Sequence, residues 1–326
     1  MNRKSKTREG IHALQRRPLG HTRFVMAVVV VLFSCSIRAN SQTRHRSAAT
    51  STSPALVITS EPNAIIWLDE VRRGVTDAAG KIALTRVSAG RHVLRVRANG
   101  FKEVSLPLLP GRRTVIVRLA RTNDEAELSF QQAEEAREKA KDDESREQAV
   151  ELYRRALKLR PAFPAAHVGL ARVLMDLNQH ENALAEIEPA RRYRPIYPEA
   201  SAVEGRIYRE MAFADEAIRS FQRAIREARG SQPESHVGLA RLFEDRGQYE
   251  GAAAEYEIAI KQLADSEPVI YQLLGAVYEK LEKYKEALAA YEKYLQLAPN
   301  GSLAPAIRSI IDQVRRQAAG QELKPD

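Results

Sequence analysis

The sequence predicts a multidomain α+β protein in which a small antiparallel β-sandwich is followed by an all-α solenoid. Two observations support this prediction. Between residues 55 and 121, short runs of alternating apolar and polar residues are separated by turn signals such as Asn99-Gly100 and Pro110-Gly111. Beyond residue 123, a pattern of small and large apolar residues recurs every 34 or 35 residues, which indicates a helical repeat. A chain of 326 residues has room for both parts.

Residues 1–39 have the character of an export signal. They carry eight Lys or Arg and one Glu, and the segment from Phe24 to Phe33 contains ten consecutive apolar residues. A membrane-spanning helix needs about 20 such residues. A basic lead, a short apolar stretch and small residues after it are instead typical of a secretory signal. We therefore expect an exported protein, periplasmic or membrane-anchored in the cell envelope, with residues 40–54 as a flexible polar linker.

The processing of this signal has two alternatives. Ordinary cleavage would follow Ala39. The sequence Leu32-Phe33-Ser34-Cys35 resembles a bacterial lipobox, and this resemblance would make Cys35 a lipidation site, a membrane anchor and the first residue of the mature protein. Cys35 is also the only cysteine of the chain. Residues downstream of it therefore contain no disulfide, iron–sulfur cluster or thiolate zinc site.

Residues 55–121, which we call the β module, are expected to form six strands. In the fourth expected strand, Arg95 and Arg97 alternate with Leu94 and therefore lie on the opposite face of the sheet. Together with Arg118 they would form a basic face able to contact anionic lipid or wall polymer. The alternatives are a solvated face or one docked on the acidic helical half. The expected strands are Leu56–Ser60, Ala64–Leu68, Lys81–Arg86, Arg91–Ala98, Lys102–Leu109 and Arg112–Arg121.

Two stretches of the β module resemble the PEGA domain, which is named after a Pro-Glu-Gly-Ala motif. They read "SEPNAIIWLDEVRRGVT" (residues 60–76) and "VSAGRHVLRVRANGF" (residues 87–101). The glycine of the motif is missing at Pro62-Asn63-Ala64, and Glu70 stands where a second turn glycine is usual. The resemblance implies a β-sandwich accessory module of extracytoplasmic or membrane-associated proteins, without catalytic residues.

The helical half repeats one apolar pattern five times. A small residue is followed by a larger one after four positions and, in four of the repeats, by another small one after seven, so all three lie on one helical face. This pattern resembles the tetratricopeptide repeat (TPR) and predicts five repeats over residues 123–300, the best of them residues 268–299. A capping helix is expected over residues 301–319 and a frayed tail over 320–326. The first small residues are Ala149, Ala183, Ala217, Ala252 and Ala287.

The TPR resemblance implies that the first helix of each repeat lines a concave groove for a partner. Arg172, Arg206 and Arg241 occupy the same place in three successive repeats, and such a ladder could bind carboxylates of an extended peptide. Alternatively, each arginine pairs with an acid four residues later in its own helix, an interaction of about 0.2–0.5 kcal/mol. The other lining residues expected are Val168, Arg209, Val237 and Gln272, and the acids are Asp176, Glu210 and Asp245.

Composition and motifs narrow the function classes. The net charge of +9 divides into +7 for residues 1–39, +9 for residues 40–122 and −7 for residues 123–326, so no uniform basic surface for nucleic acid is expected. No HExxH, GxSxG or P-loop motif occurs. We therefore expect a non-enzymatic scaffold without cofactor or metal that binds a protein or peptide partner. The alternative is an anchoring module whose β face binds peptidoglycan or anionic lipid, with the repeats as a spacer.

Overall fold

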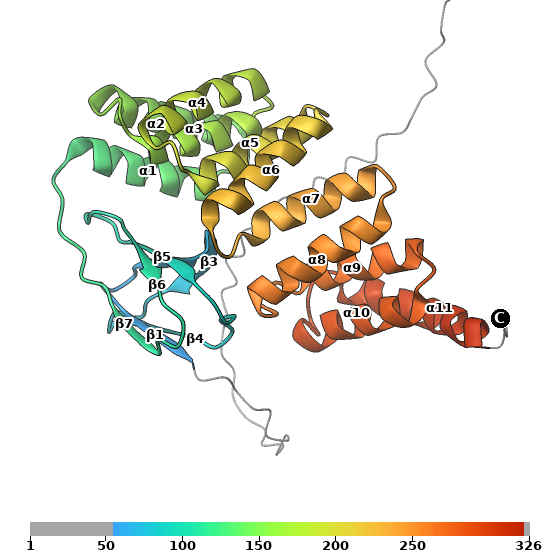
Figure 1. Cartoon of the computed structure of the whole chain (residues 1–326). Coiled ribbons are helices and arrows are strands. Elements are labelled where there is room, and N and C mark those ends of the chain that lie inside the picture. Colours follow the sequence, from blue (N-terminus) through green and yellow to red (C-terminus); the bar gives the residue numbers. More distant parts are fainter. Residues whose placement is uncertain (1–54, 323–326) are drawn as a thin grey trace, which may run out of the picture. The chain divides into compact units, whose positions relative to one another are not determined.

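The computed structural model describes residues 55–322, which form seven strands followed by eleven helices (Figure 1). This order confirms the predicted fold class, a β region followed by a helical array. The export signal, Cys35, the linker 40–54 and the last four residues lie outside the described residues. Among the residues described, no helix is long and apolar enough to cross a bilayer.

The β module contains two sheets. The seven strands are one more than expected, because Val71–Val75 also pairs. The last expected strand is shortened to three residues, and it runs parallel to β1, so the module is not wholly antiparallel. The first sheet has the order β4-β1-β7 and the second β3-β2-β5-β6. The strands are β1 (Leu56–Thr59), β2 (Ile65–Leu68), β3 (Val71–Val75), β4 (Lys81–Leu84), β5 (His92–Arg97), β6 (Val104–Leu108) and β7 (Thr114–Ile116).

The inner faces of the two sheets form one apolar core. Ile58 from the first sheet and Ile66 and Leu94 from the second are fully buried in it. Because side chains alternate along a strand, the neighbours of Ile66 and Leu94 point to the other face of the second sheet. Trp67, Arg95 and Arg97 therefore lie together, on the face turned away from the sandwich core.

The turn between β2 and β3 has an unusual composition. Asp69 and Glu70 connect the strands with φ angles of 54° and 64°. Two-residue hairpin turns with positive φ at both positions strongly favour glycine at the second. Glu70 adopts this conformation at a cost of about 1 kcal/mol or more. The glycine missing from the sequence is thus replaced by a residue that keeps the same backbone geometry.

The helices form five consecutive pairs and a final helix. Proline occupies the first turn of α3, α5 and α7, where its missing N–H costs no hydrogen bond. The pairs are α1 (Glu125–Lys139) with α2 (Asp143–Leu159), α3 (Pro164–Asp176) with α4 (His180–Tyr193), α5 (Pro198–Glu210) with α6 (Ala214–Ala228), α7 (Pro233–Asp245) with α8 (Tyr249–Leu263), and α9 (Val269–Lys280) with α10 (Tyr284–Leu297).

One large residue fills the centre of each helix pair, and small residues allow the backbones to approach. Phe221 of α6 is fully buried between Gly205 of α5 and Gly238 of α7. A Cβ atom at Gly238 would lie 2.4 Å from the Phe221 ring, so this position admits only glycine without rearrangement. Tyr153 and Tyr291 occupy equivalent places against Gly169 and Gly275.

The final helix, α11 (Ala304–Glu322), packs against α10 and buries Ile307, Ile311 and Val314. This is the expected capping contact. The helix continues past residue 319, so residues 320–322 are helical and do not belong to a frayed tail.

Candidate partner-binding surface

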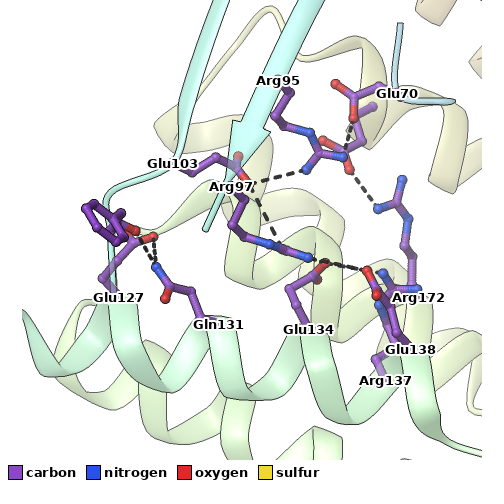
Figure 2. Close-up of polar contacts among 12 residues, drawn as sticks. Glu70, Arg95, Arg97, Glu103, Glu127, Gln131, Glu134, Arg137, Glu138 and Arg172 are labelled. Atoms are coloured by element: carbon purple, nitrogen blue, oxygen red, sulfur yellow. Dashed lines mark hydrogen bonds and ion pairs between the residues drawn. The ribbon is translucent and has the colours of Figure 1, made fainter. Parts of the chain in front are cut away.

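The outer face of β5 contacts α1 through charged side chains that are buried together (Figure 2). The Arg97 guanidinium, in a residue only 3% exposed, donates from Nη1 to Glu134 Oε2 at 3.0 Å and from Nη2 to Glu138 Oε1 at 3.4 Å. Arg72 of β3 reaches the same Glu138 at 3.3 Å. Buried charges are tolerated only when paired, so these contacts hold the β module against the first helix of the array.

Arg95 lies beside this contact. Its Nη2 atom is 2.7 Å from Glu70 Oε2 and its Nη1 atom is 3.7 Å from Glu103 Oε2. Arg95 and Arg97 also lie over the Trp67 ring, with guanidinium carbons 4.5 and 4.7 Å from the ring centroid. Such cation–π contacts gain strength when water is excluded.

The basic face predicted from Arg95, Arg97 and Arg118 is therefore not formed. Arg95 and Arg97 are buried between the β module and the helices, whereas Arg118 is exposed beyond the end of β7. Of the alternatives set out from the sequence, the structure shows the second for the two buried arginines, a face docked on the acidic helical half. Residues far apart in the sequence supply the carboxylates, which explains why local alternation could not identify them.

The arginine ladder is paired between repeats and not within each helix. Arg172 Nη1 lies 2.7 Å from Glu199 Oε1 at the start of the next first helix, and Arg206 Nη1 lies 3.2 Å from Glu234 Oε1 in the same relation. Arg172 and Arg206 therefore do not follow the alternative in which each arginine pairs with the acid four residues later in its own helix. Glu199 and Glu234 themselves recur after 35 residues, and this repetition is the sequence signal that could have identified them.

Arg241 breaks the ladder. The carboxylate partners of Arg172 and Arg206 follow them by 27 and 28 residues. The residue 28 positions after Arg241 is Val269, which has no carboxylate. Among the described residues no carboxylate lies within 4.0 Å of its guanidinium. The carboxyl group of Glu244 and the hydroxyl group of Tyr256 lie near Arg241. Burial raises the pKa of Glu244, against the opposing effects of the Tyr256 hydroxyl group and Arg241.

Exposure changes along the predicted groove. Val168 is only 1% exposed and the Arg172 side chain 15%, so the first part of the concave surface is covered. The Arg206 side chain is 23% exposed, Val269 43%, and Val237, Arg241 and Gln272 are partly exposed. Arg209 is also partly exposed and pairs with Glu210 at 2.7 Å. Residues from α5, α7 and α9 therefore remain accessible, whereas Val168 does not line an open groove.

The β module also contacts the array at a second place. Ser88 Oγ donates to the carbonyl oxygen of Gln262 at 2.8 Å, and Arg86 Nη1 donates to that of Asp265 at 3.0 Å. Val71 of β3 packs against the apolar cluster of α7, α8 and α9. The β module is thus fixed both to α1 and to the end of α8.

The pKa values of the buried carboxyl groups Glu134 and Glu70 are shifted in opposite directions. Burial alone would raise the pKa of Glu134, but Arg137, Arg97 and the hydroxyl hydrogen bond from Tyr153 outweigh it and hold this pKa well below its usual range. Burial raises the pKa of Glu70 to about 7; Arg95 and Arg172 oppose this rise, and the neighbouring Glu199 and Glu103 add to it. Glu134 is therefore ionised at neutral pH, whereas Glu70 exchanges its proton there.

Comparison with known families decides the nature of the array. Three family models of the tetratricopeptide repeat match residues 140–207, 202–268 and 268–300. The helices form a TPR array. The matched residues begin after α1 and exclude the β module, whose resemblance to the PEGA domain stays a prediction. No curated protein is significantly similar to the chain.

Solved structures resemble the TPR array in fold. The type IV pilus biogenesis factor PilW is 16% identical with a TM-score of 0.52, and the match covers 61% of this chain and 89% of PilW. PilF of Pseudomonas aeruginosa is 17% identical with a TM-score of 0.50 over the same shares. TTC0263 of Thermus thermophilus is 21% identical with a TM-score of 0.47, covering 58% of this chain and 98% of that one. At these identities, the PilW and PilF structures support the fold alone.

Proposed function

We propose that the protein is a non-enzymatic scaffold of the bacterial cell envelope that binds a protein or peptide partner on the accessible part of its concave surface. We call this part the open groove and define it by Arg206, Arg209, Arg241, Val269 and Gln272. The observation that carries the proposal is that Arg241 has no carboxylate within 4.0 Å among residues 55–322, whereas the other two arginines of the ladder are paired.

A carboxylate of the partner would complete the ladder. The guanidinium of Arg241 is partly buried, so it has lost part of its hydration without gaining the partner that Arg172 and Arg206 have. Arginine binds carboxylates through two parallel hydrogen bonds, which gives both orientation and affinity. Val269, which is 43% exposed at the start of α9, would supply an apolar contact for the chain that carries the carboxylate. We expect an acidic side chain or C-terminal carboxylate of an extended segment at Arg241.

Binding measurements with an envelope partner test the groove. The full chain and the variants Arg241→Ala and Arg219→Ala would be used to capture proteins from an envelope extract, followed by titration of each captured protein. Arg219 is the matched control because it is exposed on α6 and paired with Glu216 within its own helix. Loss of about tenfold or more in affinity for Arg241→Ala alone supports the proposal. Equal affinity of both variants contradicts it.

The envelope location is supported by the basic and apolar leader and by Leu32–Cys35. Intact-mass analysis of the protein from its host's membranes, beside Cys35→Ala, tests it. A mature chain that starts at Cys35 with added acyl mass supports a lipid anchor, and a chain that starts at Asn40 supports a soluble exported protein. An uncut chain that starts at Met1 contradicts processing at either site.

A second function is favoured by one feature of the β module. Lys81, Arg112, Arg113 and Arg118 are exposed, and none has an ion pair within 4.0 Å among the described residues. These side chains, with the 67% exposed Ile116, suit an anchoring role on anionic lipid or peptidoglycan. Sedimentation with anionic vesicles or purified peptidoglycan tests this role. Binding that is lost in Arg112→Ala/Arg113→Ala would favour anchoring over partner capture.

A further inference from the structure

A small cavity lies where the edge strands β3 and β4 meet the connection between α8 and α9. Its volume is about 320 Å³, at the lower end of the range of about 300–1,000 Å³ that is usual for small-molecule sites. Three of its four charged lining residues are arginines, so the lining carries an excess of positive charge. The polar residues that matter here are Arg72, Arg73 and Arg86 from the β module and Ser266 and Glu267 from the array.

Two of these arginines have no carboxylate partner. Arg72 pairs with Glu138 at 3.3 Å, whereas neither Arg73 nor Arg86 has a carboxylate oxygen within 4.0 Å among residues 55–322. Both donate to backbone carbonyl oxygens instead, Arg73 to that of Arg86 and Arg86 to that of Asp265, the latter at 3.0 Å. A carbonyl oxygen satisfies a donor but does not neutralise the charge of the guanidinium group. Two uncompensated cations therefore lie together at this cavity.

The acids nearest to Arg73 do not compensate it. Burial lowers the pKa of the Arg73 guanidinium, Glu267 and Asp69 oppose this effect, and the neighbouring Arg86 adds to it. The Asp69 carboxylate is already in contact with the His92 ring at 2.6 Å. Cations that are brought together without a counter-ion repel each other, and an anion held between them removes this repulsion.

The Ser266 hydroxyl group is a second polar group without a partner at the same cavity. Its Oγ atom is buried and forms no hydrogen bond within the part of the chain that the structure describes. Buried hydroxyl groups are normally hydrogen-bonded, so each exception calls for an explanation. A ligand oxygen in the cavity would accept the Ser266 hydrogen bond. This observation is independent of the arginine charges and indicates the same kind of ligand.

We propose that this cavity, which we call the arginine cavity, binds a phosphate group between Arg73 and Arg86 of the β module and Ser266 of the array. Arginine binds phosphate oxygens through paired hydrogen bonds. A phosphate monoester has a charge of about −1.5 to −2 at pH 7 and three acceptor oxygens, so it balances two guanidinium groups better than a carboxylate with a single charge. The arginine cavity is separate from the open groove and does not depend on the proposed function.

Two sources could supply this group, a soluble phosphate monoester and the headgroup of a lipid. Because residues of both parts hold it, the bound phosphate group would also strengthen the contact between the β module and the array. Glu267 is the one acid of the lining and would repel the ligand, so its charge sets an upper limit on the affinity.

Isothermal titration calorimetry of the full chain with glycerol 3-phosphate at pH 7.5 tests the soluble source. We expect affinity to fall about tenfold or more in Arg73→Met and about threefold or more in Ser266→Ala. Glu267→Gln should raise the affinity about threefold, a gain that misfolding cannot produce. The matched controls are Arg155→Met and Glu250→Gln, which remove one exposed charge of each sign from α2 and from the first turn of α8 and should leave the affinity unchanged.

Sedimentation with phosphatidylcholine vesicles, with and without phosphatidic acid, tests the lipid source, because the headgroup of phosphatidic acid is a phosphate monoester. Arg112→Ala/Arg113→Ala is the background, since it removes the other exposed basic side chains from the comparison. Binding of either ligand that is weakened by Arg73→Met and strengthened by Glu267→Gln supports the phosphate site and identifies its source. Binding of neither ligand, or equal binding by Arg73→Met and Arg155→Met, would overturn the proposal.

Discussion

Removal of the Arg97 side chain tests how strongly the β module is held. Arg97→Met keeps an unbranched apolar side chain but removes the guanidinium that pairs with Glu134 and Glu138 and covers Trp67. Breaking one partner of a buried pair costs about 3–5 kcal/mol because the other charge stays buried. The lost cation–π contact adds about 1 kcal/mol. Arg137 and Tyr153 still contact Glu134, so we expect a loss at the lower end, about 3 kcal/mol.

The assay is urea unfolding of the full chain at pH 6, followed by Trp67 emission. The double variant Arg97→Met/Glu134→Gln should recover part of the loss, with a coupling free energy of about 2 kcal/mol. Arg118→Met, which removes an exposed arginine from the same module, should change the free energy of unfolding by less than about 0.5 kcal/mol. A loss below about 1 kcal/mol for Arg97→Met, or no coupling to Glu134, would refute the reasoning.

Two further predictions concern the interior of each part. Gly238→Ala should destabilise the array by about 1–3 kcal/mol in thermal or urea unfolding, because its Cβ atom would lie 2.4 Å from the Phe221 ring. Gly251→Ala should cost less, because the atom nearest to its Cβ would lie 3.1 Å away. Equal losses of stability in the two variants would contradict the packing argument. His92 contacts acceptors with both ring nitrogens, Asp69 Oδ2 at 2.6 Å and Ser88 O at 2.8 Å, and the hydrogen bond to Asp69 raises its pKa above 6.5. The contribution of His92 to stability is therefore complete below pH 6.5 and lost as the pH rises through its raised pKa. The measurement uses Glu70→Gln as the background, because the pKa of Glu70 is about 7 and falls in the same range. The free energy of unfolding of Glu70→Gln should fall from pH 5.5 to 8.5, and this fall should vanish in Glu70→Gln/His92→Gln.

The sequence predicted those parts of the fold that depend on short-range pattern. The spacing of Ala149 and its counterparts identified the repeats, and the alternation around Leu94 placed Arg95 and Arg97 on the correct face of β5. The pattern could not show what covers that face, because Glu134 and Glu138 resemble any solvated acids on an amphipathic helix. Their burial depends on two parts of the chain meeting, which no local period encodes.

The missed strand and the misassigned ladder have the same origin. β3 reads Val-Arg-Arg-Gly-Val, and its polar residues hide the strand because Arg72 and Arg73 point to partners outside the sandwich core. In the ladder, an acid four residues away was the nearest partner along the helix. The solenoid instead brings the start of the next first helix alongside Arg172 and Arg206, 27 or 28 residues later in sequence.

Chemical modification of arginines tests most directly whether the β module covers the first repeats and leaves the later ones accessible. The wild-type full chain would be treated with phenylglyoxal at pH 6. The rate of modification at each arginine would be measured by mass spectrometry of the resulting peptides. The structure predicts slow modification of Arg95, Arg97 and Arg172 and fast modification of Arg118, with Arg241 between them. Modification of Arg97 and Arg172 as fast as that of Arg118 would contradict the account.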